Sequence, residues 1–293
     1  MKIIKNLACL TLVIVACACS NGFQLNPERS AILARDAAAS NTVPDRVGVA
    51  AAGSRTRTPR VDDEDIVVAA AAANPARLEN DRIVDARRKG DEVMKFLQIR
   101  PGMTVLDLYS GGGYYSELAS LIVGAKGAVV AHNNKPYLDF AKKELEARYT
   151  PGRLANVQRI TAENNEIELA PARFDAVLMV DAYHDIYYVD GQNGWQKIDG
   201  PKLMAEVFKS LKPGGVLGVI DHVAAAGAPP ETGGTLHRID PELMKKEIVA
   251  AGFEFEAQSD LLRNRQDDHT KPIFDASIRG RTDQILMKFR KPR

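Results

Sequence analysis

The sequence is poor in cysteine, and the few cysteines it has lie close to its start. Only three of its 293 residues are cysteines, namely Cys9, Cys17 and Cys19. A disulfide framework, a cysteine nucleophile and a zinc-thiolate site are therefore excluded from the rest of the chain. The compact metal-ligand motif HExxH is also missing, so we expect no metal cofactor.

An excess of charge of one sign is missing as well. The formal net charge is +1, although 26% of the residues are charged. Charge-driven binding to nucleic acid needs a basic excess or a basic run. We therefore expect no nucleic acid among the partners, and a small-molecule ligand instead.

A third absence is a long hydrophobic run. The apolar segment 7–16 is shorter than the roughly 20 residues of a helix that spans a bilayer, which makes a permanent membrane span the weaker alternative. It follows Lys2 and Lys5 and precedes small residues, a pattern typical of a secretion signal.

The end of this signal resembles a bacterial lipobox, in which a cysteine is lipidated and becomes the new N-terminus. Residues 14–17 read Ile-Val-Ala-Cys, so Cys17 is the first candidate and Cys19 the second. Ordinary cleavage after Ala18 is the alternative. Either way, the sequence predicts an exported, periplasmic protein. A lipid anchor on Cys17 or Cys19 would be its only link to the membrane.

Composition divides the chain into three segments. Residues 1–19 form the signal, and residues 20–74 are predicted to be a flexible or poorly ordered tether because they show no sustained periodicity. Residues 75–293 are predicted to form one domain, which begins where Asn74 could cap a helix with Pro75 at its first position.

Strand and helix patterns alternate along this domain. Strands are expected at residues 104–108, 128–132, 157–160, 174–180 and 216–220. Such alternation implies a mostly parallel sheet with helices on both faces. Two more strands, at 253–258 and 282–289, have no helix between them and should be antiparallel neighbours. The prediction is an α/β fold with a single doubly wound, mostly parallel seven-stranded sheet and an antiparallel last strand.

Three strings in this domain resemble strand motifs of class I S-adenosylmethionine-dependent methyltransferases. They are VLDLYSGGGYYSEL, FDAVLMVDAYHD and LKPGGVLGVIDH, which begin at residues 105, 174 and 211. Through GGGYYSE, GGTLHRID, SDLLRN, DDHT and IRGRTD the chain more closely resembles a bacterial family of predicted exported methyltransferases. The resemblance implies a Rossmann-like methyltransferase fold and S-adenosylmethionine as cofactor.

The resemblance also implies a set of cofactor-binding residues. A glycine turn at a helix start lets the backbone approach a ligand and favours an anionic group, here the amino acid part of the cofactor. Two positions depart from the superfamily pattern, since Tyr109 stands where the first glycine is usual and Asn133 where an acid usually binds the ribose. The expected cofactor residues are Asp107, Gly111, Gly112, Gly113, Tyr114, Asn133, Glu163 and Asp181.

The histidines are expected at one edge of the sheet. Ligands of open α/β sheets bind beyond the carboxyl ends of the strands. All five histidines follow predicted strands, and Tyr114, Tyr115, Tyr183, Tyr187, Tyr188 and Trp195 could line an aromatic pocket beside them. Those histidines are His132, His184, His222, His237 and His269.

Methyl transfer needs an aligned nucleophile and, for a hydroxyl or amine acceptor, a base. His184 is the first candidate for this base and His222 the second, with Asp181, Asp185 or Asp221 orienting an imidazole. The predicted function is S-adenosylmethionine-dependent methyl transfer to a small molecule. Two alternatives stay open: a non-catalytic ligand-binding lipoprotein on a methyltransferase scaffold, and a metal-dependent enzyme with ligands among His184, Asp185, Asp221 and His222.

Overall fold

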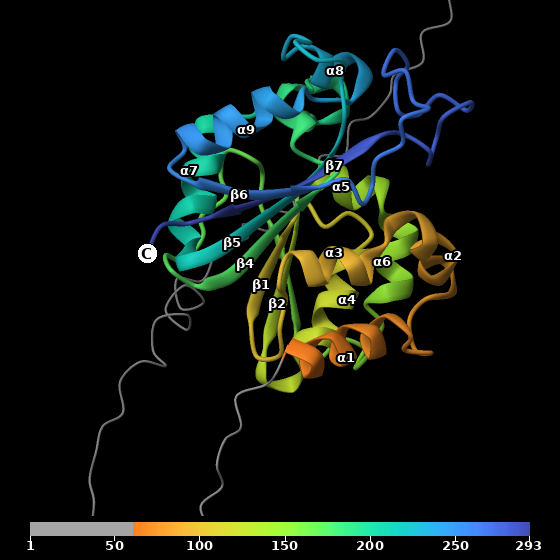
Figure 1. Ribbon diagram of the computed structural model, residues 1–293, viewed down its shortest axis with the longest axis vertical. Coiled ribbons are helices and arrows are strands. Elements are labelled where there is room, and N and C mark those ends of the chain that lie inside the picture. The colour runs from red at the N-terminus through yellow and green to blue at the C-terminus, as the bar shows by residue number, and fades with distance from the viewer. Residues whose placement is uncertain (1–60) are drawn as a thin grey trace, which may run out of the picture. The chain divides into compact units, whose positions relative to one another are not determined.

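The computed structural model describes residues 61–293, which are built around one seven-stranded sheet (Figure 1). The strand order is β3-β2-β1-β4-β5-β7-β6, in which β7 runs antiparallel to both of its neighbours. This confirms the predicted doubly wound sheet with a reversed last strand. The strands are β1 (Thr104–Leu108), β2 (Ala128–Asn133), β3 (Val157–Thr161), β4 (Phe174–Val180), β5 (Leu211–His222), β6 (Glu254–Ser259) and β7 (Gln284–Arg290).

The sheet is covered on both faces because its central strands are apolar on both sides. In β1, Val105 packs into one hydrophobic cluster and Leu106 and Leu108 into the other, as the two-residue period of a strand requires. All three side chains are fully buried. The parallel register from β3 to β5 brings the carboxyl ends of these strands to one edge of the sheet.

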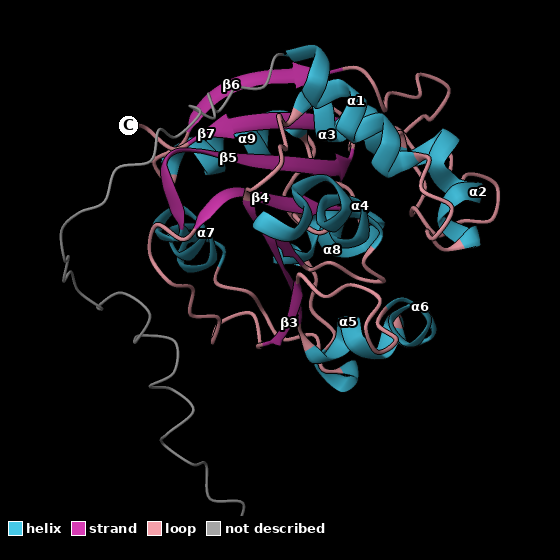
Figure 2. Cartoon of the chain, turned by 90° about the horizontal axis from the view of Figure 1, so that it is seen from below, coloured by secondary structure: helices cyan, strands magenta, loops and turns pink. Residues whose placement is uncertain are grey.

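Helices from the two halves of the chain cover opposite faces (Figures 1 and 2). Buried side chains of α1, α3 and α4 belong to one cluster, while those of α7 and α9 belong to the other. The helices are α1 (Val61–Ala72), α2 (Glu79–Arg88), α3 (Gly90–Phe96), α4 (Tyr114–Val123), α5 (Lys135–Phe140), α6 (Lys142–Arg148), α7 (Gly200–Ser210), α8 (Thr232–Leu236) and α9 (Pro241–Ala250).

The folded domain starts earlier than the sequence predicted. Helix α1 lies inside the segment expected to be a tether, and its Val68 and Ala71 are buried against α3 and α4. The predicted boundary at residue 75 is therefore wrong, because an alanine-rich segment without amphipathic periodicity still buries a few small side chains. Asn74 does accept a hydrogen bond from the Ala76 amide, but it starts a turn, and the next helix begins only at Glu79.

The predicted signal lies outside the described residues, as do Cys17, Cys19 and residues 20–60 of the predicted tether. Within residues 61–293, no helix is both long enough and apolar enough to cross a membrane.

Candidate active site

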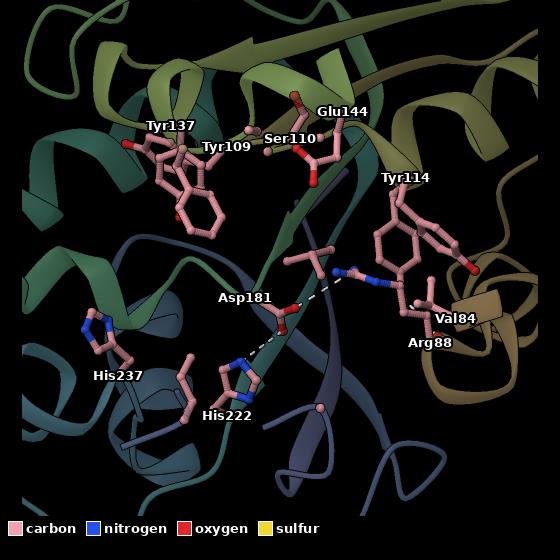
Figure 3. A pocket seen from close by; sticks show the side chains of 18 of the residues that line it. Val84, Arg88, Tyr109, Ser110, Tyr114, Tyr137, Glu144, Asp181, His222 and His237 are labelled. Atoms are coloured by element: carbon pink, nitrogen blue, oxygen red, sulfur yellow. Dashed lines mark hydrogen bonds and ion pairs between the residues drawn. The ribbon is translucent and has the colours of Figure 1, made fainter. Parts of the chain in front are cut away.

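A pocket of about 770 Å³ opens at the edge of the sheet where the parallel strands end (Figure 3). The turn after β1 and the start of α4 form one half of its wall, together with residues of α2 and α6. The residues that follow β4 and β5 form the other half, together with the loop before β7. Pockets for small molecules and cofactors usually measure about 300 to 1,000 Å³, so this pocket has room for both a cofactor and an acceptor.

The glycine turn after β1 has an unusual backbone conformation. Tyr109, Gly111 and Gly113 have φ angles of 57°, 53° and 81°, in the left-handed region that glycine adopts most easily. The side chain of Asn133 holds this turn, because its Oδ1 accepts from the Gly111 amide at 2.9 Å and its Nδ2 donates to the Gly111 carbonyl at 3.0 Å. Asn133 therefore supports the turn from behind and does not line the pocket.

A buried guanidinium fixes the same turn from α6. Arg148 Nε donates to the Gly112 carbonyl, and its terminal nitrogens pair with Asp81 of α2 and Glu117 of α4. Burial opposes the charge of Arg148, but the hydrogen bonds and charges of these acids outweigh it and raise its pKa. One cation thus ties three helices and the glycine turn together.

Opposite charges lie next to the turn. Asp107, at the end of β1, is 2% exposed and accepts a hydrogen bond from Ser116 Oγ at 2.6 Å. Burial raises the pKa of Asp107 to about 6. Arg88 of α2 lies over the ring of Tyr114 and 4.0 Å from the carboxylate of Asp181 (Figure 3). These cationic and anionic groups match the zwitterionic amino acid part of S-adenosylmethionine.

Two polar atoms in this wall are buried without a partner among residues 61–293. They are Ser110 Oγ and the hydroxyl oxygen of Tyr109, both in the turn that lines the pocket. A buried polar group without a partner is costly, and bound ligands often supply the missing hydrogen bond. The residues present therefore fit a polar cofactor at this turn.

The structure places five of the eight predicted cofactor residues at the pocket: Asp107, Gly111, Gly112, Tyr114 and Asp181. The other three do not line it. Gly113 packs against Arg148 and Tyr149, where an added Cβ would lie 2.8 Å from both side chains. Glu163 accepts from the Lys135 amide at 3.2 Å, and Asn133 holds Gly111 as described. Neighbouring positions of one motif thus have different roles: some line the pocket, and others pack against the rest of the protein.

His184 follows β4 and is clamped by two carboxylates. Its Nδ1 lies 2.6 Å from Asp221 Oδ1, and its Nε2 lies 3.2 Å from Asp185 Oδ1. Burial disfavours a charged imidazole, but Asp221 and Asp185 outweigh it and hold the pKa of His184 well above its usual value. Both ring nitrogens face carboxylate oxygens in this structure, so the geometry does not favour His184 as the base, and that role stays a prediction.

His222, at the end of β5, has the opposite character. Its Nδ1 lies 2.9 Å from Thr282 Oγ1, and its Nε2 lies 3.7 Å from Asp181 Oδ1 (Figure 3). Burial lowers the pKa of His222, although Asp181 and Asp221 act against it, so the ring is neutral near pH 7. When Nδ1–H donates to Thr282, the lone pair of Nε2 is left on the side of Asp181.

Three of the five histidines line the pocket, namely His184, His222 and His237. The other two only support the edge of the sheet. His132 is fully buried, with Nε2 at 3.0 Å from the Ala162 carbonyl, and burial lowers its pKa to about 4. His269 Nε2 lies 3.0 Å from Asp283. All five histidines thus lie at the edge of the sheet where the sequence predicted them, but only three of them line the pocket.

Aromatic rings form much of the remaining wall. Tyr109 stacks on Tyr137 with ring centroids 5.4 Å apart, and Tyr137 in turn contacts Trp195. Of the predicted aromatic residues, Tyr114, Tyr115, Tyr188 and Trp195 line the pocket, whereas Tyr183 and Tyr187 donate to Glu247. No sequence pattern predicted Tyr137 at this wall, because it lies within a helix and three residues after the capping Asn134.

Fold and pocket together define a class I S-adenosylmethionine-dependent methyltransferase. The model of the protein-L-isoaspartate(D-aspartate) O-methyltransferase family matches residues 61–217, and the chain belongs to this family. This confirms the predicted methyltransferase enzyme class, with S-adenosylmethionine as its cofactor.

More distant similarities agree with this class. A ubiquinone/menaquinone biosynthesis C-methyltransferase, UbiE, from Vibrio vulnificus strain YJ016 is 30% identical over 123 residues, and one from Haemophilus ducreyi is 29% identical over 124. These matches cover 42% of the chain and 42% of each relative's length.

Solved structures share the fold. A SAM-dependent methyltransferase from Aquifex aeolicus is 20% identical, with a TM-score of 0.50 over 71% of this chain and 92% of its own. A putative methyltransferase in complex with the Trm112 methyltransferase activator from Haloferax volcanii gives 0.50, at 16% identity over 77% of this chain and 98% of that chain.

Proposed function

We propose that this chain transfers the methyl group of S-adenosylmethionine to a small molecule with a planar aromatic ring, outside the cytoplasm. One observation carries the proposal. A single pocket is lined both by the glycine turn with Asp107 and by His222, His237 and several aromatic rings.

The cofactor half would hold the amino acid part of the cofactor. The backbone of Ser110 and Gly111, the carboxylate of Asp107 and the guanidinium of Arg88 are the groups that would bind it. Glu144 of α6 lies beside the turn and is the acid we assign to the ribose hydroxyls, since Asn133 is otherwise engaged (Figure 3). When bound, the cofactor supplies an electrophilic methyl group.

His222 is the residue that we assign as base. Its Nε2 would accept the proton that an acceptor hydroxyl or amine loses, and Thr282 would hold the ring in the required tautomer. Asp181 lies beside Nε2 and would stabilise the imidazolium that forms. His184 instead positions the neighbouring carboxylates Asp185 and Asp221.

The acceptor proposal rests on Tyr137, Tyr188, Trp195 and Phe274, which surround the histidine half. Flat aromatic walls favour stacking with a planar ring. The relatives named for ubiquinone and menaquinone biosynthesis make quinol-type rings a first choice. The family name suggests an isoaspartyl peptide instead, but the family model ends at residue 217, before His222 and Phe274.

Calorimetry with S-adenosylhomocysteine tests the cofactor half. Gly111→Val should abolish binding, because a side chain there has no protein neighbour within 4 Å and would occupy the pocket. Gly152→Val is the matched control, since Gly152 also has a left-handed φ and open surroundings but does not line the pocket. Equal losses in both variants would show backbone strain, and no heat from the unaltered chain would remove the proposal.

A panel with labelled S-adenosylmethionine tests the acceptor half. It should contain hydroxylated aromatic rings, quinols, simple aliphatic alcohols and an isoaspartyl peptide. We expect label in aromatic acceptors only. Transfer to the peptide alone would replace the proposed acceptor, and intact cofactor binding without any transfer would favour a ligand-binding protein on a methyltransferase scaffold.

Export is supported by the sequence of residues 1–19 alone. The full chain with a C-terminal tag should fractionate with membranes in a bacterial host and take up labelled fatty acid. Cys17→Ala should abolish the label if Cys17 is the lipidated residue, with Cys19→Ala as the counterpart. Recovery of an uncleaved chain in the cytoplasm would contradict this part of the proposal.

A further inference from the structure

We propose that His184, Asp185 and His237 form a binding site for a divalent transition-metal ion in the histidine half of the pocket. One ligand atom from each of the three residues lies within 4.8 Å of the others. All three residues line the pocket. The sequence-based alternative paired His184 and Asp185 with Asp221 and His222, whereas the geometry brings His237 to them.

The first two ligands are held from behind by neighbours, and a metal ion at His184 Nε2 would displace the proton that this nitrogen shares with Asp185. Asp221 Oδ1 lies 2.6 Å from His184 Nδ1, which directs His184 Nε2 toward Asp185 Oδ1 at 3.2 Å. The hydroxyl of Tyr137 donates to the other carboxylate oxygen, Asp185 Oδ2, at 2.6 Å. A carboxylate on the far nitrogen of a ligating histidine is the usual support for metal ligands in proteins.

The third ligand, His237, lies at the end of a short helix and not at the end of a strand. His237 ends α8 with a left-handed φ of 54°, and its Nδ1 lies 3.7 Å from Asp185 Oδ1. Its ring packs against Tyr188 at 4.7 Å and Phe274 at 5.0 Å between centroids. A histidine in this strained conformation, packed between two rings, is fixed in place facing the other two ligands.

The charges around the site favour a cation. The carboxylates of Asp185 and Asp221 are almost fully buried, at 7% and 0% exposure. The buried guanidinium of Arg238 is paired with Asp267 instead. A divalent ion at His184 Nε2 would lie between the carboxylate ligand and the aspartate behind the ring, where buried negative charge is best compensated.

Two imidazoles and one carboxylate select the type of ion. Imidazole nitrogen suits Zn²⁺ and Fe²⁺, whereas Mg²⁺ prefers oxygen ligands. Three protein ligands leave further coordination positions open, as in catalytic metal sites, and the site faces the pocket. The site stands independently of the proposed reaction. Only its use, which is to hold an oxygen of the acceptor, rests on the proposed function.

Zinc titration of the chelator-treated full chain, followed by calorimetry, tests the site. We expect one Zn²⁺ per chain at micromolar concentration or below, and no comparable binding of Mg²⁺. His237→Asn should weaken Zn²⁺ binding at least tenfold, since asparagine tolerates the left-handed backbone but is a poor metal ligand.

His269→Asn is the matched control. His269 also has a left-handed φ, of 62°, and also contacts an aspartate, Asp283, but it lies outside the cluster. Unchanged Zn²⁺ binding in His269→Asn, with weakened binding in His237→Asn, would support the site. Absence of Zn²⁺ binding, or equal losses in the two variants, would overturn it.

Two further measurements separate loss of the metal site from loss of folding and from loss of cofactor binding. Thermal unfolding of each variant shows whether it is folded, and Asp185→Asn offers a second ligand change should His237→Asn fail to fold. Titration of the same samples with S-adenosylhomocysteine separates the two proposals, because loss of the metal site alone should leave the cofactor half intact. Zinc binding without cofactor binding would overturn the proposed methyl transfer and leave the metal site standing.

Discussion

The two halves of the pocket are each built around one buried nitrogen-bearing side chain held by carboxylates, but the two side chains act differently. Arg148 donates hydrogen bonds to the glycine turn and to acids of two helices, and so it fixes the backbone that lines the cofactor half of the pocket. His184 sits between Asp221 and Asp185, and beside it His222 and His237 face the pocket. In one half the buried side chain fixes the backbone of the glycine turn, whereas in the other it lies among imidazoles that face the pocket.

Removing the scaffold cation should have the largest effect. Arg148→Met leaves Asp81 buried without its partner and Glu117 paired with Arg153 alone, which we expect to lower the free energy of unfolding by about 3 to 5 kcal/mol. Urea denaturation measures this. Lys209→Met is the control, since its pair with Glu206 is exposed and should be worth less than about 1 kcal/mol. Similar losses in both variants would contradict the role of Arg148 as the buried centre of this half.

Removing the reactive imidazole should affect rate but not stability. His222→Gln is expected to lower kcat by at least about a hundredfold with an acceptor that turns over, as loss of a general base does. The affinity for S-adenosylhomocysteine should change little. His269→Gln, outside the pocket, should keep full activity.

The pH profile sharpens the same prediction. Burial lowers the pKa of His222, so with S-adenosylmethionine kept saturating at every pH, kcat/KM for the acceptor should rise with pH through a value below the ordinary 6.5 of histidine and then level off. In His222→Gln this rise should disappear. A profile that is the same in both proteins would show that His222 is not the base.

This contrast also explains what the sequence could predict. The sheet and the glycine turn are encoded locally, because alternating apolar strands and a glycine run after Asp107 specify backbone within a short window. The predicted bounds of all seven strands agree with the structure to within a few residues, except at the start of β5. This strand begins at Leu211 and so includes residues that the sequence predicted as a turn.

The histidine half could not be assembled in the same way. Its groups come from residues 181–185, 221–222, 237 and 273–282, and their contacts depend on loop conformations between strands. Thr282 at His222, and His237 at Asp185, join segments that are far apart in sequence. Asn133 lies where a ribose ligand was expected, but its side chain points toward the glycine turn. There its amide oxygen and nitrogen pair with the Gly111 N–H and carbonyl.

A substitution at Asn133 should have an effect of intermediate size on stability. Asn133→Asp restores the acid that is usual at this position in the superfamily, but it removes the donor to the Gly111 carbonyl. We expect a loss of about 1 to 3 kcal/mol in stability, the cost of leaving a buried acceptor unpaired, and weaker binding of S-adenosylhomocysteine. Urea denaturation and calorimetry measure the two effects. Tighter cofactor binding in Asn133→Asp would show that this position contacts the ribose after all.

The smallest effect that we predict comes from proton binding to Asp107. Burial raises its pKa to about 6, so below that pH the carboxylate that would pair with the cofactor's amino group is increasingly neutral. The affinity for S-adenosylhomocysteine should be constant above pH 7 and fall by about tenfold, or 1.4 kcal/mol, between pH 7 and pH 5. Calorimetry over this range measures the fall.

Stability should respond to Asp107 in the opposite direction. A folded-state pKa above the unfolded value of 3.8 means that the protonated carboxyl stabilises the fold below pH 3.8, and that this contribution is lost as the pH rises through about 6. Asp107→Asn should therefore flatten both curves between pH 5 and pH 7. If acid weakened ligand binding equally in Asp107→Asn, the dependence would belong to another group, and the glycine-turn half would lose its assigned anion.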